Sequence, residues 1–132
     1  DSKYHFDNGE INWFTPGDIK DFFIAASNRK VTKRAIDDGA VELYPEKTIL
    51  VVGIGATLGK VSLIIEKGGS NQQINAVICN DELIPEFALY FLSSFEGVLK
   101  SISNASTLAI LTQSDLKNMI FAKPKAKETP KK

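Results

Sequence analysis

The stretch Thr48-Ile-Leu-Val-Val-Gly-Ile-Gly-Ala-Thr-Leu-Gly-Lys-Val-Ser-Leu-Ile-Ile65 decides the fold, because it places an apolar, β-branched run on either side of a glycine-rich segment. Residues 48–52 and 60–65 have the composition of short strands, and Gly53 to Lys60 connects them. A third run of this kind follows at 74–79. The sequence therefore predicts three strands joined by glycine turns, with 53–60 forming a β-hairpin.

The same glycines invite a nucleotide-binding interpretation, which their spacing disfavours. A phosphate-binding loop requires Gly, four residues, and then Gly-Lys-Ser/Thr, because the hydroxyl holds magnesium. Here Ile54 stands five positions before Gly59, and Val61 replaces the hydroxyl residue. A dinucleotide fingerprint would need a helix after the last glycine, whereas a strand is expected there. The glycines are instead expected to permit positive φ and close approach of strands.

Shorter elements are predicted on the N-terminal side of the hairpin. Residues 11–14 have the pattern of a strand, and Pro16-Gly17-Asp18-Ile19 predicts a tight turn that leads into a short helical stretch through Phe23. Thr32 is placed to cap a helix over 33–38, which Gly39 would close.

On the C-terminal side the hydrophobic period changes to three and four residues, which predicts one helix of about five turns over 85–102. A strand at 108–111, a short helix beginning at 112–115 and a last strand at 119–122 are expected after it. The sequence thus predicts one mixed, strand-rich α+β domain over 1–122 with a single main helix. Residues 123–132, rich in Lys and Pro, are expected to form a disordered tail, as the start of a spacer or an added remnant.

Composition narrows the class of protein. The 132 residues suit one domain, and 16 basic side chains balance 16 acidic ones, which argues against binding nucleic acid by bulk charge alone. A single cysteine excludes an internal disulfide, no Cys/His cluster indicates zinc, and no run approaches the roughly 18 apolar residues of a membrane span. The start at Asp1, without methionine, suggests a fragment.

Catalytic residues are not apparent. His5 lies in a polar, turn-rich stretch without a nucleophile and base around it, and Cys79 is expected to behave as a small buried hydrophobe. Trp13 and Phe14 are expected to pack in the core rather than to stack on an extruded base. The sequence therefore predicts a non-enzymatic protein and gives no sign of a cofactor.

Several short motifs follow one another in a characteristic order along the chain. They are Gly9-Glu-Ile-Asn-Trp13, Thr15-Pro-Gly-Asp-Ile19, Arg29-Lys-Val-Thr32, Ala35-Ile36, Ile54-Gly-Ala-Thr-Leu-Gly-Lys-Val-Ser-Leu63, Ser70-Asn-Gln-Gln-Ile-Asn-Ala76, Tyr90-Phe-Leu-Ser-Ser94, Ala105-Ser-Thr-Leu108 and Asp115-Leu116. Together they resemble the target-recognition domains of type I restriction–modification specificity subunits, and the likeness covers nearly the whole chain.

The resemblance departs from the family pattern at both ends. Family members usually begin with a further strand and a Gly-Thr-Pro turn, and they usually end in Pro-Pro-Leu and a Glu-Gln pair that starts a long spacer helix. Here Lys123-Pro-Lys-Ala-Lys-Glu-Thr129 stands instead. A complete subunit also resembles two such domains in tandem. This chain is therefore expected to be an excised domain or the single domain of a half-length subunit.

What the resemblance implies is recognition of one half of a split site in double-stranded DNA, without chemistry or cofactor of its own. The implied partners are a methyltransferase subunit, a motor–nuclease subunit and a second recognition domain, in the cytoplasm and not at a membrane.

Candidate DNA contacts fall into three groups. Cations suit phosphates, and an arginine can also bind a guanine, although these cations also fit an ordinary solvated helix start. Small polar residues in the loops 24–31, 67–70 and 103–107 are candidates for base recognition. The amides of Asn71, Gln72 and Gln73 suit adenine, but because they belong to the family motif a role in holding the loop is favoured. The cations are Arg29, Lys30, Lys33, Arg34 and Lys60, and the loop candidates are Ser27, Asn28, Asn104, Ser106 and Thr107.

One alternative stays open at this point. The helix predicted over 85–102 could instead dock onto a protein partner, which would make the chain an interaction module that does not bind DNA.

Overall fold

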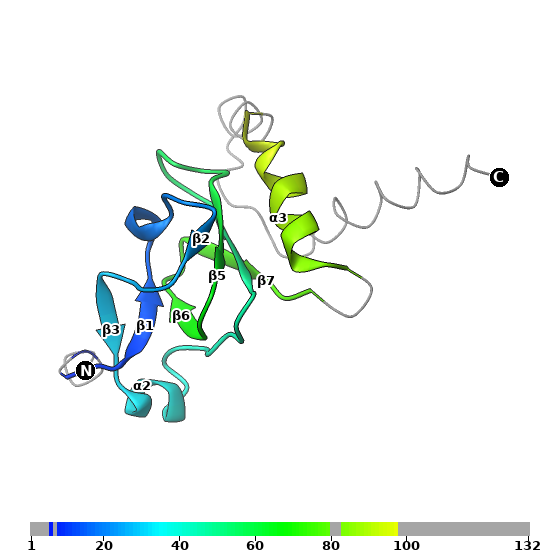
Figure 1. Cartoon of the computed structure of the whole chain (residues 1–132). Coiled ribbons are helices and arrows are strands. Elements are labelled where there is room, and N and C mark those ends of the chain that lie inside the picture. Colours follow the sequence, from blue (N-terminus) through cyan, green and yellow to red (C-terminus); the bar gives the residue numbers. More distant parts are fainter. Residues whose placement is uncertain (1–5, 7, 80–82, 98–132) are drawn as a thin grey trace.

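The computed structural model describes Phe6, residues 8–79 and residues 83–97. Two sheets and one main helix make up this part of the chain (Figure 1). The elements are β1 (Ile11–Phe14), the 3-10 helix η1 (Pro16–Asp18), β2 (Phe23–Ile24), β3 (Arg29–Val31), α2 (Lys33–Asp37), β4 (Ile49–Val52), β5 (Val61–Ile64), β6 (Gly68–Ser70), β7 (Ile74–Val77) and α3 (Pro85–Ser93).

The larger sheet has the strand order β2-β5-β4-β7 and contains the predicted hairpin. Strands β4 and β5 pair antiparallel with Val51 opposite Val61, so the segment from Gly53 to Lys60 is confirmed as a hairpin turn. Gly55 and Gly59 have φ of 99° and 95°, which side chains other than glycine rarely adopt. The three predicted central strands are therefore all present.

The central strands are buried on both faces, which explains their continuous apolar runs. All four residues of β4 and all four of β5 are buried. Side chains alternate between the two faces of a strand. Ile49 and Val51 therefore pack in one cluster with Leu89 of α3, whereas Leu50 packs on the opposite face in a cluster with Phe14 of β1. The larger sheet thus forms a middle layer between α3 and the smaller sheet.

The smaller sheet has the order β3-β1-β6 and includes two strands that the sequence did not predict. Residues 24–31 were expected to form a loop, but Arg29–Val31 pairs antiparallel with β1 as β3. Residues 67–70 were expected to form a loop, but Gly68–Ser70 pairs parallel with β1 as β6. The two backbones come so close that a Cβ atom on Gly68 would lie 2.9 Å from the Cβ of Asn12. Glycines that resemble a turn in the sequence here permit close packing of strands.

The predicted helices are confirmed in one case and corrected in another. Thr32 caps α2 as expected, since its Oγ1 accepts a hydrogen bond from the Ala35 N–H at 3.2 Å, and Gly39 follows the helix with φ of 79°. The helical stretch expected through Phe23 is wrong, because η1 ends at Asp18 and β2 pairs with β5. Long-range pairing of β2 prevails there over the local turn signal.

The main helix begins at Pro85 as predicted, but the single helix of about five turns is wrong, because α3 ends at Ser93 and a turn follows at 94–95. The continuation predicted for 98–102, the elements predicted at 108–122 and the tail at 123–132 lie outside the described residues. Within the described ranges, no helix has the length and apolarity required to cross a membrane.

Candidate nucleic-acid interface

The outer strand of the smaller sheet carries the first of the predicted contact residues. Strands β3 and β1 pair antiparallel, with Arg29 directly opposite Trp13. Ser27, just before β3, accepts a hydrogen bond from the Trp13 backbone N–H at 2.9 Å, and its own N–H donates to Asn12 Oδ1 at 3.2 Å. The backbone N–H of Asn28 donates to the Asp18 carboxylate at 3.0 Å. Ser27 is therefore engaged inside the fold, whereas the Asn28 side chain is exposed.

Among the described residues, Arg29 is held by aromatic rings and not by an acid. Its guanidinium carbon lies 4.1 Å from the ring centroid of Phe6 and 5.1 Å from that of Trp13. The two rings meet edge to face, with centroids 5.0 Å apart. Within the part of the chain that the structure describes, no carboxylate pairs with Arg29. Its planar N–H donors are thus positioned by stacking and remain available for an anion or a base.

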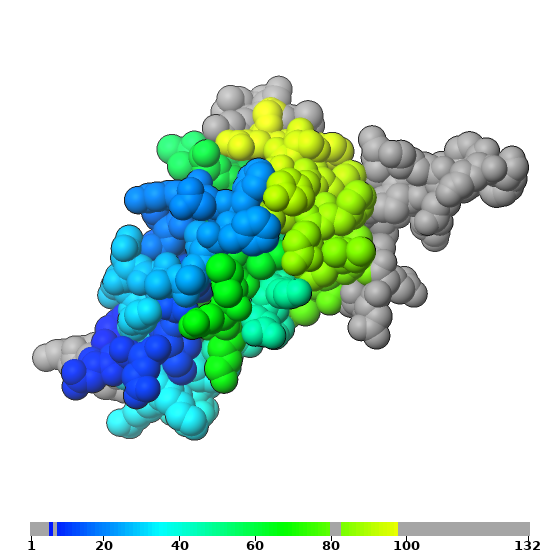
Figure 2. Space-filling model, in the orientation of Figure 1, coloured from blue at the N-terminus to red at the C-terminus, as the bar shows by residue number. Residues whose placement is uncertain are grey.

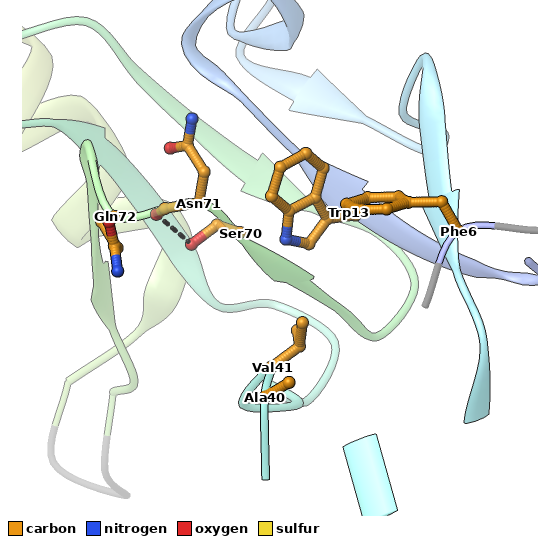
Figure 3. Close-up of a pocket in the computed structure, with 7 residues that line it drawn as sticks. All are labelled: Phe6, Trp13, Ala40, Val41, Ser70, Asn71 and Gln72. Atoms are coloured by element: carbon orange, nitrogen blue, oxygen red, sulfur yellow. Dashed lines mark hydrogen bonds between the residues drawn. The ribbon is translucent and has the colours of Figure 1, made fainter. Parts of the chain in front are cut away.

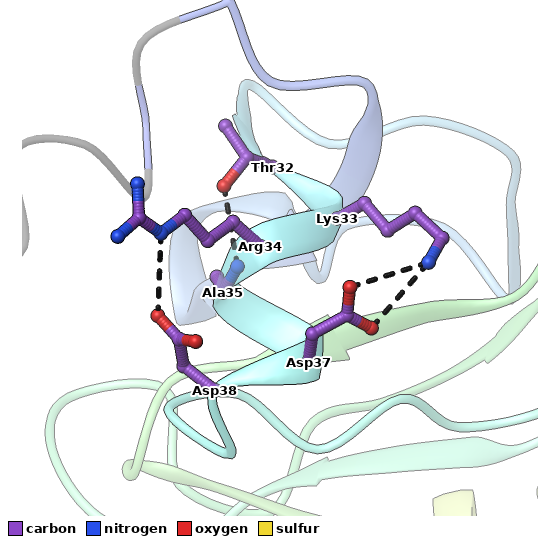
Figure 4. Close-up of polar contacts among 6 residues, drawn as sticks. All are labelled: Thr32, Lys33, Arg34, Ala35, Asp37 and Asp38. Carbon is purple, nitrogen blue, oxygen red and sulfur yellow. Dashed lines mark hydrogen bonds and ion pairs between the residues drawn. The ribbon is translucent and has the colours of Figure 1, made fainter.

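The other cations of this segment already have partners (Figure 4). Lys33 pairs with Asp37 at 3.2 Å, and Arg34 pairs with Asp38 at 3.7 Å, both across one turn of α2. The Nζ of Lys30 donates to Asn12 Oδ1 at 2.5 Å. The predicted basic cluster is therefore largely neutralised over α2, and Arg29 is its most available cation.

Lys60 does not join this cluster. It sits where the hairpin turn enters β5, and the turn lies at the top of Figure 1 whereas α2 lies at the bottom. Strand β1 runs between the two regions. Ile11, at its start, lines a surface hollow together with Lys33, and the residues just after its end line another hollow together with the hairpin turn. Asn104, Ser106 and Thr107 lie outside the described residues.

A cavity of about 460 Å³ lies beside Arg29, and we call it the Trp13 pocket (Figure 3). Three segments form it together with Phe6: strand β1, the loop after α2, and the end of β6 with the turn that follows it. Its lining residues are Phe6, Trp13, Ala40, Val41, Ser70, Asn71 and Gln72.

Trp13 corrects an expectation from the sequence. Phe14 is fully buried in the core as predicted, but Trp13 is only partly buried and forms one wall of the pocket. The strand period explains the difference, because Asn12 and Phe14 point inward and Trp13 therefore points outward. The alternation in residues 11–14 was the signal that could have identified Trp13 as a surface residue.

The three amides of the following turn are not equivalent. Asn71 Oδ1 accepts the Gln73 N–H at 3.0 Å, and the two side chains bond at 3.3 Å. The Asn71 N–H donates to the Phe14 carbonyl at 3.0 Å, and the Gln73 carbonyl accepts from Gly53 N–H at 2.8 Å. Asn71 and Gln73 thus hold the turn against β1 and the hairpin. The exposed Gln72 makes no hydrogen bond to any other described residue.

The single cysteine, Cys79, packs against the hydrophobic cluster that includes Leu89 and Leu92 of α3. Burial raises the pKa of the Cys79 thiol, and nearby Glu86 raises it further, so the thiol stays protonated and is a weak nucleophile. Among the residues that the structure describes, no cluster of three or more His, Cys, Asp or Glu side chains could hold a metal ion. His5 falls outside those residues.

Comparison with known proteins gives a consistent result. Residues 2–132 match a family model described as the type I restriction modification DNA specificity domain. The type I restriction enzyme MjaIX specificity subunit of Methanocaldococcus jannaschii is 28% identical over 128 residues, which are 93% of this chain and 29% of that protein. The EcoR124I/EcoR124II specificity subunit of Escherichia coli is 26% identical over 92 residues, or 67% of this chain and 23% of that protein.

A solved structure supports the fold. The crystal structure of the HsdS subunit from Thermoanaerobacter tengcongensis superposes with a TM-score of 0.60 at 20% identity, covering 87% of this chain and 26% of that one. The chain therefore spans less than a third of each of these three proteins.

Proposed function

Because the chain belongs to the family of type I restriction modification DNA specificity domains, we propose that it recognises one half of a bipartite DNA site for a restriction–modification complex. In this role it selects the sequence, a methyltransferase subunit modifies the DNA, and a motor–nuclease subunit cleaves it. A second recognition domain supplies the other half of the site. The chain itself carries out no reaction and acts in the cytoplasm, where the cell's DNA is accessible.

The observation that carries the proposal, beyond family membership, is the arrangement of Arg29. A guanidinium that is stacked on two aromatic rings and lacks an acid partner among the described residues is already oriented before DNA arrives. Less conformational entropy is then lost on binding than with a flexible lysine. Arginine can contact either a phosphate or the O6 and N7 atoms of guanine.

The balance of charge also fits this role. The chain has no net formal charge, so uniform attraction to DNA cannot supply its affinity. A small number of oriented contacts at β3 and at the Trp13 pocket is a better match to sequence recognition than a broad basic surface. We place the DNA-contacting surface on the smaller sheet for this reason.

The test is DNA binding by the protein in complex with its methyltransferase subunit, measured by fluorescence anisotropy on labelled duplex at several salt concentrations. Arg29→Ala is expected to weaken binding and to reduce the slope of log K against log salt by about 0.9 per lost phosphate contact. Lys33→Ala is the matched control, because Lys33 is already paired with Asp37 at 3.2 Å. Equal affinities and slopes for both variants and the wild type would contradict the proposed surface.

A second candidate function, protein docking, is favoured by a specific observation on the other side of the molecule. Four aromatic side chains of β2, its preceding residue and α3 are 40% to 50% exposed. The Phe22 and Tyr90 rings meet at 5.1 Å, and β2 and α3 lie side by side in the space-filling view (Figure 2). We call this group the α3 aromatic surface; its members are Phe22, Phe23, Phe87 and Tyr90.

Exposed aromatic groups of this kind are typical of protein interfaces. On the recognition hypothesis, the α3 aromatic surface would contact another part of the complex. On the alternative hypothesis it would be the main functional site, and the chain would associate with a partner without binding DNA. A salt-dependent shift of duplex DNA separates the two hypotheses, since only the first predicts it.

A further inference from the structure

We propose that the Trp13 pocket accepts the edge of an A·T base pair and that Gln72 is the residue that recognises its adenine. This inference rests on the proposed DNA-recognition function and assigns one particular contact to it. It makes Gln72 a specificity-determining residue and separates it from the two neighbouring amides.

The first step is the availability of Gln72. Asn71 and Gln73 use their side chains on each other and on the turn backbone, at 3.0 Å and 3.3 Å. Gln72 is exposed, is one of the residues that line the pocket, and has no hydrogen-bond partner in the described part of the chain. The NH2 group of a glutamine amide can donate to N7 of adenine while its carbonyl oxygen accepts from the N6 amino group, both in the major groove.

The second step is the apolar part of the pocket lining. Trp13, Ala40 and Val41 line the same pocket as Gln72 and come from β1 and from the loop after α2 (Figure 3). The base that pairs with adenine is thymine, and its methyl group is the apolar feature of the major-groove edge. A pocket with an amide and an apolar wall therefore matches an A·T pair better than a G·C pair, which has no methyl group.

The third step is the position of Arg29. Its guanidinium lies over the Trp13 ring at 5.1 Å, and the same ring forms a wall of the pocket. A phosphate bound by Arg29 would therefore bring the nucleic-acid backbone next to the pocket. Phosphate contacts fix the position of a protein on the duplex, and base contacts supply the sequence preference. Arg29 and Gln72 divide these two tasks.

The experiment is selection of binding sites from a pool of random duplexes, with the protein in complex with its methyltransferase subunit. Gln72→Ala is expected to lose the preference for A·T at one position, with a roughly five- to 150-fold smaller difference between the best and the mismatched base. Gln73→Ala is the matched control, because this amide bonds to Asn71 and should leave the selected sequence unchanged. Thermal unfolding of each complex shows that the variants remain folded.

A change in the DNA tests the apolar wall separately. Replacing the thymine at that position with uracil removes only the methyl group. Uracil is expected to weaken binding by the wild-type protein and to have no effect on Trp13→Ala, which lacks the indole wall. Equal binding of thymine and uracil duplexes by the wild type would contradict the methyl contact and overturn the proposed A·T assignment.

The outcomes distinguish this inference from the function on which it rests. If the wild type selects a defined sequence and Gln72→Ala relaxes an A·T position, the inference is supported; relaxation at a G·C position overturns the A·T assignment. If both select the same sequence with the same stringency, the role of Gln72 is overturned and DNA recognition stands. If the wild-type complex selects no sequence, the proposed function fails and the inference fails with it.

Discussion

At the scale of single residues, Gly9 controls how closely β1 and β3 approach. A Cβ atom at this position would lie 2.7 Å from the carbonyl carbon and oxygen of Lys30, a separation that the backbone must relieve by moving. The contact adjoins the hydrogen bond from the Glu10 N–H to the Val31 carbonyl, at 3.1 Å. The distance between β1 and β3, and with it the spacing of Trp13 and Arg29, therefore depends on Gly9, which is not itself a proposed DNA contact.

Gly9→Ala is expected to lower the free energy of unfolding by about 1–3 kcal/mol, because the added methyl overpacks a backbone contact. Urea unfolding followed by circular dichroism measures the change. Gly17→Ala is the control, since the nearest heavy atom to its Cβ is Thr15 Oγ1 at 3.9 Å, and a change within about 0.5 kcal/mol is expected. Similar losses for both variants would show that the tight approach at Gly9 is not the cause.

Tyr44 should make stability depend on pH in the alkaline range. Burial raises the pKa of its phenol above the ordinary 10.0, Glu42 raises it further, and a hydrogen bond with Ser70 opposes both. The folded state therefore holds the proton more tightly than the unfolded state. The resulting stability is fully present below the unfolded pKa and is lost as pH rises through the folded pKa.

Tyr44→Phe is expected to remove this part of the alkaline dependence. The measurement is the free energy of unfolding between about pH 8 and pH 11, compared with the wild type, because the loss begins near the unfolded pKa. Tyr90→Phe serves as the control, since Tyr90 is half exposed on α3. If Tyr44→Phe shows the same pH dependence of the free energy of unfolding as the wild type, Tyr44 is not its source.

At the scale of elements, α2 shows how a basic sequence can form a neutral surface. Its two cations each pair with an aspartate one turn later, at 3.2 Å and 3.7 Å. These side chains are exposed, so the pairs contribute little to stability, and their main effect is on the local field. The element as a whole should add little to DNA affinity.

Asp37→Asn is expected to release Lys33 and to increase DNA affinity, with a salt slope steeper by up to about 0.9 if one phosphate contact is gained. Glu46→Gln removes the same charge from an exposed site in another loop, so it measures the effect of net charge alone. Anisotropy titrations at several salt concentrations give both quantities. An identical slope for the two variants would show that Lys33 gains no DNA contact when it is released.

The elements also divide according to what a sequence can predict. Strand β1, the hairpin of β4 and β5 and the cap of α2 were predicted, because each depends on periodicity or on residues close in sequence. Strands β2, β3 and β6 were missed because each is defined by pairing with a strand elsewhere in the chain, β5 for β2 and β1 for the other two. Two glycines at 68–69 resemble a turn, and nothing in their local sequence indicates that they pair with β1.

The sequence did not distinguish the residues of the candidate site from their neighbours. Arg29 was one of five cations proposed as contacts, and Gln72 was grouped with Asn71 and Gln73, for which a role in holding the loop was favoured. What separates them is three-dimensional: Asp37 neutralises Lys33, whereas Trp13 lies opposite Arg29 across the strand pair. Bonds to Asn71 likewise engage Gln73 and not Gln72.

At the scale of the whole molecule, the two proposed surfaces belong to different sheets. Arg29 and the Trp13 pocket lie on the smaller sheet, and the α3 aromatic surface lies on the larger sheet and its helix (Figure 1). The buried strands β4 and β5 separate them, since one face of these strands packs against α3 and the other against Phe14 of β1. This arrangement would let the chain bind DNA and a protein partner at the same time.

The proposed separation predicts that changes on the two surfaces act independently. Arg29→Ala should weaken DNA binding without changing association with the methyltransferase subunit, and Phe87→Ala, at a side chain that is 50% exposed, should do the reverse. In the double variant the two free-energy changes should add to within about 0.3–0.5 kcal/mol, as is usual for sites without shared partners. Anisotropy with labelled DNA and calorimetric titration of the subunit measure the two equilibria. A coupling energy well above this range would mean that the core between the sheets transmits binding from one surface to the other, and the two surfaces would then have to be treated as one site.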